Sequence, residues 1–238
     1  MSQERHSLID TITDGIVPVH GEGYKFLAVG AIVALLLFWL WPPGAWVAVL
    51  ALAYVAYFFR DPPRVTPLRE GLIVAAADGR VSSIERVRPP RELGLGDEPR
   101  IRISIFLSVF DVHIQRAPVA GRIVRSVYTP GTFLNAALDK ASEENERRAL
   151  VISTPTGVDV GVVQIAGLIA RRIVTFAQEG DSIGIGERFG LIRFGSRVDL
   201  YLPPEHGALV AVGQRAVGGE TIMADLKSAE PEREARRQ

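Results

Sequence analysis

The stretch "GLIRFGSRVDLYLP", residues 190–203, has apolar residues at alternate positions from Val198 to Leu202. This period of two is typical of a half-buried β-strand, because successive side chains of a strand point to opposite faces of the sheet. Gly195 and Ser196 interrupt the pattern, and a glycine inside a strand often marks a bulge or a close backbone approach. The stretch therefore predicts a strand with an irregularity at Gly195–Ser196, and a bulge is the simplest interpretation.

Similar short segments rich in Val and Ile, separated by Gly and Pro, occupy most of the chain after residue 60. They are residues 71–87, 100–109, 121–131 and 149–167. Such spacing predicts a mainly β (α+β) domain built as a β-sandwich or barrel. A glycine turn inside a Val/Ile hairpin recurs in it and resembles the lipoyl-like hairpin sandwich, although no lipoylation lysine motif is present. The charged segment 138–150 interrupts the strands and is expected to be a solvated helix or loop.

An uncharged apolar segment, residues 26–59, precedes this domain and contains Pro42-Pro43-Gly44 near its middle. Each apolar arm would form roughly 24 Å of helix, slightly less than the ~30 Å hydrocarbon core of a bilayer. The prolines predict a helical hairpin that spans or enters the membrane, and a buried hairpin of a soluble fold is the alternative. Lys25 and Arg60 flank the hairpin, so the positive-inside rule places the following domain on the cytoplasmic side of the cell membrane.

The chain of 238 residues thus divides into a polar N-terminal segment, a membrane hairpin, a β-rich domain and a polar tail, at 1–25, 26–59, 60–226 and 227–238. Lys plus Arg and Asp plus Glu are both 27, so no net basic charge favours a nucleic acid partner. Cysteine is absent, which excludes disulfides and thiolate nucleophiles. The four histidines lack metal-ligand spacing, so we expect no metal.

Three residues of the β-rich domain could carry chemistry: Asp78 in "AAADGRV", His113 in "FLSVFDVHIQRAPVAGRI", and Ser196. Each also has a purely structural interpretation, as an Asp-Gly turn, a buried core histidine and a residue beside a bulge, respectively. Together, a carboxylate, an imidazole and a serine on separate strands could form an activated nucleophile.

Four segments, in order, resemble the phosphatidylserine decarboxylase family in its short branch. They are "ADG" (77–79), "FLSVFDVHIQRAPVAGRI" (106–123), "YTPGTFLNAALDKASEENER" (128–147) and "RFGSRVDLYLP" (193–203). The similarity extends from about residue 60 to 225, and the apolar N-terminal hairpin also fits the family.

The resemblance implies that the chain is a proenzyme that cuts itself between Gly195 and Ser196. Ser196 would become a pyruvoyl group, the only cofactor, and the two chains, 1–195 and 196–238, would remain together as a heterodimer. The pyruvoyl carbonyl would form a Schiff base with the amine of phosphatidylserine, CO2 would leave, and phosphatidylethanolamine would be the product. His113 is our candidate for the acid that protonates the carbon after CO2 has left.

The chain departs from the family pattern at Arg116, because the longer branch has a second histidine at this position that forms an Asp-His-Ser set. Either His113 serves both self-cleavage and decarboxylation, or Asp78 acts without an intermediate histidine. Arg116 could contact a phosphate or carboxylate of the substrate, since its planar guanidinium suits both, or form a plain surface ion pair.

Two other functions fit parts of the sequence. The chain could decarboxylate another serine-headed lipid, since nothing in the sequence reports on the lipid tails. It could also be a non-enzymatic, membrane-anchored, lipoyl-like adaptor. The adaptor would not require cleavage at Gly195–Ser196, whereas both decarboxylases would.

Overall fold

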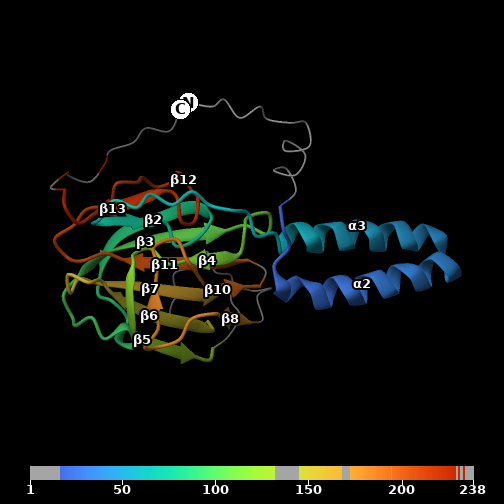
Figure 1. The fold of residues 1–238 in the computed structure, drawn as a ribbon, viewed down its shortest axis with the longest axis horizontal. Coiled ribbons are helices and arrows are strands. Elements are labelled where there is room, and N and C mark those ends of the chain that lie inside the picture. Colours follow the sequence, from blue (N-terminus) through green and yellow to red (C-terminus); the bar gives the residue numbers. More distant parts are fainter. Residues whose placement is uncertain are drawn as a thin grey trace, which may run out of the picture. The chain divides into compact units, whose positions relative to one another are not determined.

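The computed structural model describes residues 17–131, 145–167, 172–193, 195–228, 230 and 233. The chain forms two compact units, Met1–Pro63 and Arg64–Gln238. The described part of the first unit is helical, and that of the second consists of β-strands, loops and one short 3-10 helix (Figure 1). The predicted mainly β class with apolar helices at its N-terminal side is therefore confirmed.

Two helices, α2 (Gly21–Leu40) and α3 (Pro42–Phe58), make up most of the described part of the first unit. They form the predicted hairpin, because an antiparallel bridge joins Val19 to Arg60 at its open end. The rings of Phe26 and Phe59 stack there, with their centroids 5.4 Å apart. α2 is long and apolar enough to cross a membrane, with a mean hydropathy of 2.0.

The helical break lies one residue earlier than the sequence suggested. Trp41 alone separates the two helices, and Pro42 to Gly44 form the first turn of α3. Proline is well tolerated there, because the N–H groups of a first helical turn have no partner within the helix. The prolines therefore begin the second helix.

An eight-stranded antiparallel sheet dominates the second unit and curls around the core (Figure 1). Its strands, in spatial order, are β12 (Arg215–Ala216), β2 (Gly79–Val87), β3 (Arg100–Leu107), β11 (Ser196–Tyr201), β7 (Asp159–Ala166), β6 (Arg147–Ser153), β5 (Gly121–Thr129) and β9 (Ser182–Ile183). A three-stranded sheet has the order β4 (Ile114–Arg116), β10 (Arg188–Ile192) and β8 (Ile173–Thr175). A third sheet pairs β1 (Leu72–Val74) with β13 (Ile222–Asp225).

β11 lies in the middle of the large sheet and is buried on both faces. The prediction of a half-buried strand from its alternation is therefore wrong. Val198 and Leu200 belong to the main core. On the other face, Tyr201 packs in a second apolar cluster with Leu93 of the 3-10 helix η1 (Arg91–Leu93). The charged residues of that face are tolerated because Arg197 Nε and Asp199 Oδ1 lie 2.9 Å apart and neutralise each other.

The prediction of a solvated helix or loop for the charged segment 138–150 is also corrected in part. Residues 147–150 belong to β6, which pairs with β5 on one side and β7 on the other. Partners on both sides satisfy the backbone of this segment in the extended conformation, whatever its local charge pattern favours. Residues 138–144 lie outside the described part of the chain.

Candidate active site

The Gly195–Ser196 pair lies at a corner between two sheets. β10 ends at Ile192 in the three-stranded sheet, and β11 begins at Ser196 in the large sheet. Gly195 has φ +64°, in the left-handed region that glycine adopts without a steric penalty. The irregularity that the sequence predicted is therefore a left-handed corner, and the interpretation as a bulge within one strand is wrong.

Ser196 is fully buried, with an exposed fraction of 0%. Among the described residues, its Oγ has no hydrogen-bond partner. An unpaired buried hydroxyl costs about 1–3 kcal/mol, so native structures rarely keep one without a reason. Its Oγ is also four bonds from the carbonyl carbon of Gly195, so attack on that carbon would close a five-membered ring.

His113 contacts this corner directly. Its Nε2 accepts a hydrogen bond from the backbone N–H of Gly195, at 3.2 Å. Its Nδ1 lies 2.9 Å from the backbone carbonyl oxygen of Asp111, which can only accept. The two bonds assign the proton to Nδ1 and the lone pair to Nε2, so the neutral ring presents a basic nitrogen to the N–H of Gly195, the residue that precedes Ser196.

The loop that orients His113 is itself fixed by the carboxylate of Asp111. Asp111 Oδ2 accepts hydrogen bonds from the N–H of Ser108, at 2.8 Å, and from its hydroxyl, at 2.7 Å. Asp111 Oδ1 pairs with Arg215 on β12, at 2.6 Å. Asp111 lies within residues 106–123, one of the segments that carry the family resemblance, but no pattern in the sequence marks it as the residue that orients His113.

Asp78 reaches the same end of the large sheet. Arg80 pairs with Phe106 on β3, and Ser196 pairs with the adjacent Leu107, so Asp78 and Ser196 flank the last residues of β3. The Asp78 carboxylate binds Arg64 Nη2 through both oxygens, at 2.8 and 2.9 Å. Among the described residues it makes no hydrogen bond to His113 or Ser196.

The environment of Asp78 affects its ionisation. Burial raises the pKa of the Asp78 carboxyl above its usual value, while the positive charge of Arg64 and a hydrogen bond from the Gly218 N–H act in the opposite direction. Arg64 belongs to the proline-rich connector after the hairpin. Its pairing with Asp78 was not predictable from a local pattern, because 14 residues separate the two.

Arg116 ends strand β4 and is only 7% exposed, so a plain surface ion pair does not describe it. Its Nη1 donates to the backbone carbonyl of Gly186, at 3.1 Å. Its backbone N–H donates to Ala76, two residues before Asp78. The second-histidine position of the family pattern is therefore occupied by a buried guanidinium near the Asp78 turn.

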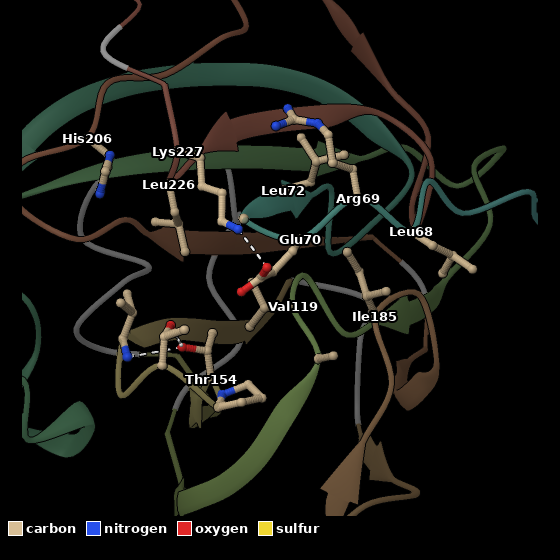
Figure 2. Close-up of a pocket in the computed structure, with 15 residues that line it drawn as sticks. Leu68, Arg69, Glu70, Leu72, Val119, Thr154, Ile185, His206, Leu226 and Lys227 are labelled. Carbon is tan, nitrogen blue, oxygen red and sulfur yellow. Dashed lines mark hydrogen bonds and ion pairs between the residues drawn. The ribbon is translucent and has the colours of Figure 1, made fainter.

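A cavity of about 440 Å³ lies elsewhere in the second unit (Figure 2). Its apolar lining includes Leu72, Val119 and Leu226, and Lys227 and Glu70 form an ion pair of 2.6 Å at its edge. The turn that follows β6 also lines it. Arg147 at the start of β6 pairs with Ile165, next to the Ala166 that pairs with Ser196, so this wall of the cavity lies at the opposite end of β6 from the corner.

A buried serine that follows a glycine bound by a histidine, in a curled antiparallel sheet, is an arrangement that a mainly β enzyme could use for nucleophilic chemistry. The family model described as phosphatidylserine decarboxylase matches residues 51–224. The phosphatidylserine decarboxylase proenzyme of Xanthobacter autotrophicus is 58% identical over 231 residues, which cover 97% of this chain and 99% of that protein. The chain belongs to the phosphatidylserine decarboxylase family, and it is a decarboxylase, so the non-enzymatic adaptor is excluded.

Proposed function

We propose that this chain is a self-cleaving proenzyme that converts phosphatidylserine to phosphatidylethanolamine and CO2. The observation that carries the proposal is the geometry of the corner. A left-handed Gly195 precedes a buried Ser196 whose Oγ has no hydrogen-bond partner among the described residues, and His113 Nε2 accepts the N–H of Gly195. Membership of the family and the proenzyme name of the similar protein support the same function.

Self-cleavage begins when His113 Nε2 takes the proton of the Ser196 hydroxyl. The Oγ attacks the carbonyl carbon of Gly195, the C–N bond breaks, and the released nitrogen takes the proton back from His113, which leaves an ester. Elimination across the Cα–Cβ bond of Ser196 frees the carboxylate of Gly195 and leaves dehydroalanine. Water then hydrolyses this residue to a pyruvoyl group and ammonia.

The proposal assigns a role to each residue of the site. The pyruvoyl group derived from Ser196 would supply an electron sink for the carbanion formed as CO2 leaves. His113 would donate the proton that this carbanion takes up. Asp78, paired with Arg64, would set the local charge near Ser196, and Arg116 would hold the phosphate or carboxylate of the substrate.

The hairpin would attach the enzyme to the cell membrane, with residues 60–226 on the cytoplasmic side as a lipoyl-like catalytic domain. The apolar length of α2 and the basic residues Lys25 and Arg60 support this placement. After cleavage, β11 would keep its pairing with β3 and β7, so the chains 1–195 and 196–238 would remain together without a disulfide.

The intact mass of the purified protein tests this proposal. We expect two chains, 1–195 and 196–238, and a small chain that resists Edman degradation because a pyruvoyl group has no amine. Reduction by borohydride in the presence of an amine should label the small chain.

Ser196→Ala is the matched control for the mass measurement. It removes only the attacking oxygen, so the chain should fold and remain whole. Efficient cutting of Ser196→Ala would show that an external protease acts, and a wild-type chain that is active while whole would overturn the pyruvoyl mechanism.

A further inference from the structure

The carbonyl oxygen of Gly195 has a defined hydrogen-bond donor. The backbone N–H of Gly167, which follows β7, donates to this oxygen at 3.1 Å. In the proposed self-cleavage, attack by Ser196 Oγ turns this same oxygen into an oxyanion. A donor already aimed at the oxygen where negative charge develops stabilises the transition state without any rearrangement.

The peptide group that carries this N–H is held from its other side. The carbonyl oxygen of Ala166, in the peptide group Ala166–Gly167, accepts a hydrogen bond of 2.7 Å from Asn145 Nδ2. Asn145 is fully buried, and Ala166 pairs with Ser196 across β7 and β11. One peptide group thus links the amide of Asn145 to the carbonyl of the bond to be cut.

Two physical effects make this link relevant to catalysis. Donation to the carbonyl of a peptide group polarises it and strengthens the hydrogen bond that its N–H makes, particularly where water is excluded. The bond from Asn145 also fixes the orientation of the peptide plane, and therefore the direction of the Gly167 N–H. Removing the Asn145 amide should weaken both effects while leaving Ser196 and His113 in place.

We infer that the Ala166–Gly167 peptide group is the oxyanion site of self-cleavage, and that Asn145 is a positioning residue that holds it. The inference rests on the proposed function, because it concerns the step in which the ester forms. In that step the Ser196 proton moves to His113 and the Oγ–C bond forms. The electron pair of the Gly195 carbonyl moves onto its oxygen, opposite the Gly167 N–H. It returns as the C–N bond breaks, and His113 gives its proton to the released nitrogen.

The test compares self-cleavage rates of full-length chains made by cell-free synthesis in the presence of detergent. Asn145→Ala and the isosteric Asn145→Asp both remove the amide donor, and each should slow self-cleavage at least about tenfold, since loss of an oxyanion donor itself costs about 10²–10³. Glu146→Ala is the matched control. Its side chain is also buried and holds a backbone group, the N–H of Ile173, at 3.2 Å. It should cleave at the wild-type rate.

Hydroxylamine, which cuts an accumulated ester, adds a measurement that a merely structural role would not affect. It should not accelerate cleavage of Asn145→Ala, because the slowed step precedes the ester. Melting temperatures of the Asn145→Ala and Asn145→Asp variants, each measured on the uncleavable Ser196→Ala background, should show that the chain remains folded.

Three results would overturn the inference. They are self-cleavage of Asn145→Ala at the wild-type rate, self-cleavage of Glu146→Ala as slow as that of Asn145→Ala, or faster cleavage of Asn145→Ala when hydroxylamine is added. A wild-type chain that remains whole is a different failure, because it overturns the proposed function together with this inference. The two failures are therefore distinguished by the wild-type sample alone.

Discussion

The second unit has two contrasting places, the corner at Gly195–Ser196 and the cavity beside the turn after β6. The cavity has open volume, but its charged residues are paired, as in Lys227–Glu70 and in Arg69–Asp225, both at 2.6 Å. Ser196 at the corner is fully buried, yet its hydroxyl has no partner among the described residues. The cavity therefore offers space among paired charges, whereas the corner offers a buried hydroxyl without a partner close to a glycine that bonds an imidazole.

The largest effect should come from His113, the proposed base at the corner. His113→Ala removes the lone pair that faces Gly195, so self-cleavage should slow by at least ~100-fold, the usual scale for a positioned acid–base group. The rate can be followed as the appearance of the small chain on a gel. Asp78→Asn is the comparison, since it keeps the shape of Asp78 and removes its charge. If Asp78→Asn stays whole while His113→Ala cuts normally, the base is Asp78.

Arg64 tests the electrostatics of the corner. Arg64→Ala leaves the Asp78 carboxylate buried without its ion pair, and we expect the free energy of unfolding to fall by about 2 kcal/mol near neutral pH. This lies below the 3–5 kcal/mol for fully buried pairs because the Arg64 side chain is 13% exposed. The measurement is thermal unfolding of the detergent-solubilised chain at several pH values.

The loss of unfolding free energy in Arg64→Ala, which we call its stability deficit, should depend on pH in a defined direction. Burial already holds the pKa of Asp78 above its value in the unfolded chain, so ionising it costs stability as the pH rises between the two pKa values. Removing Arg64 raises the folded pKa further and widens this window. The deficit relative to wild type should therefore grow with rising pH and vanish in acid, where Asp78 is protonated in both proteins. A deficit independent of pH would mean that Arg64 acts through packing.

Gly195 permits a matched comparison of backbone strain at the corner and away from it. Gly195 and Gly213 both have positive φ, and an added Cβ at either would meet no atom of the described residues within 4 Å, apart from its chain neighbours. Gly195→Ala and Gly213→Ala should therefore each cost about 1–2 kcal/mol of stability through strain alone. Only Gly195→Ala should slow self-cleavage, by about tenfold, because relaxation to negative φ moves its N–H from His113 and its carbonyl from Gly167. Equal cleavage rates in the two variants would remove the left-handed conformation from the mechanism.

The smallest effect should come from the edge of the cavity. Lys227→Ala breaks an ion pair whose side chains are 54% and 70% exposed, and such pairs contribute about 0.2–1 kcal/mol. Self-cleavage should proceed at the wild-type rate, as judged by the mass of the two chains. Slow self-cleavage of Lys227→Ala would show that the edge of the cavity affects the corner, and the two places would then not be independent.

The sequence by itself determined most of the strands, the apolar hairpin and an irregularity at Gly195–Ser196, because these depend on periodicity, on a run without charges and on a glycine that interrupts an apolar alternation. It misjudged β11 and the start of β6, because burial on both faces and pairing with two neighbours are set by distant strands.

Only the tertiary structure decided what surrounds the Gly195–Ser196 bond. Arg64 meets Asp78, the Asp111 carbonyl orients His113, and the Gly167 N–H meets the carbonyl of Gly195. The last two contacts use backbone atoms, which every residue carries, so no residue type announces them in a sequence. The physical reason is that a fold brings such groups together through strand register and loop conformation, and these depend on the whole chain.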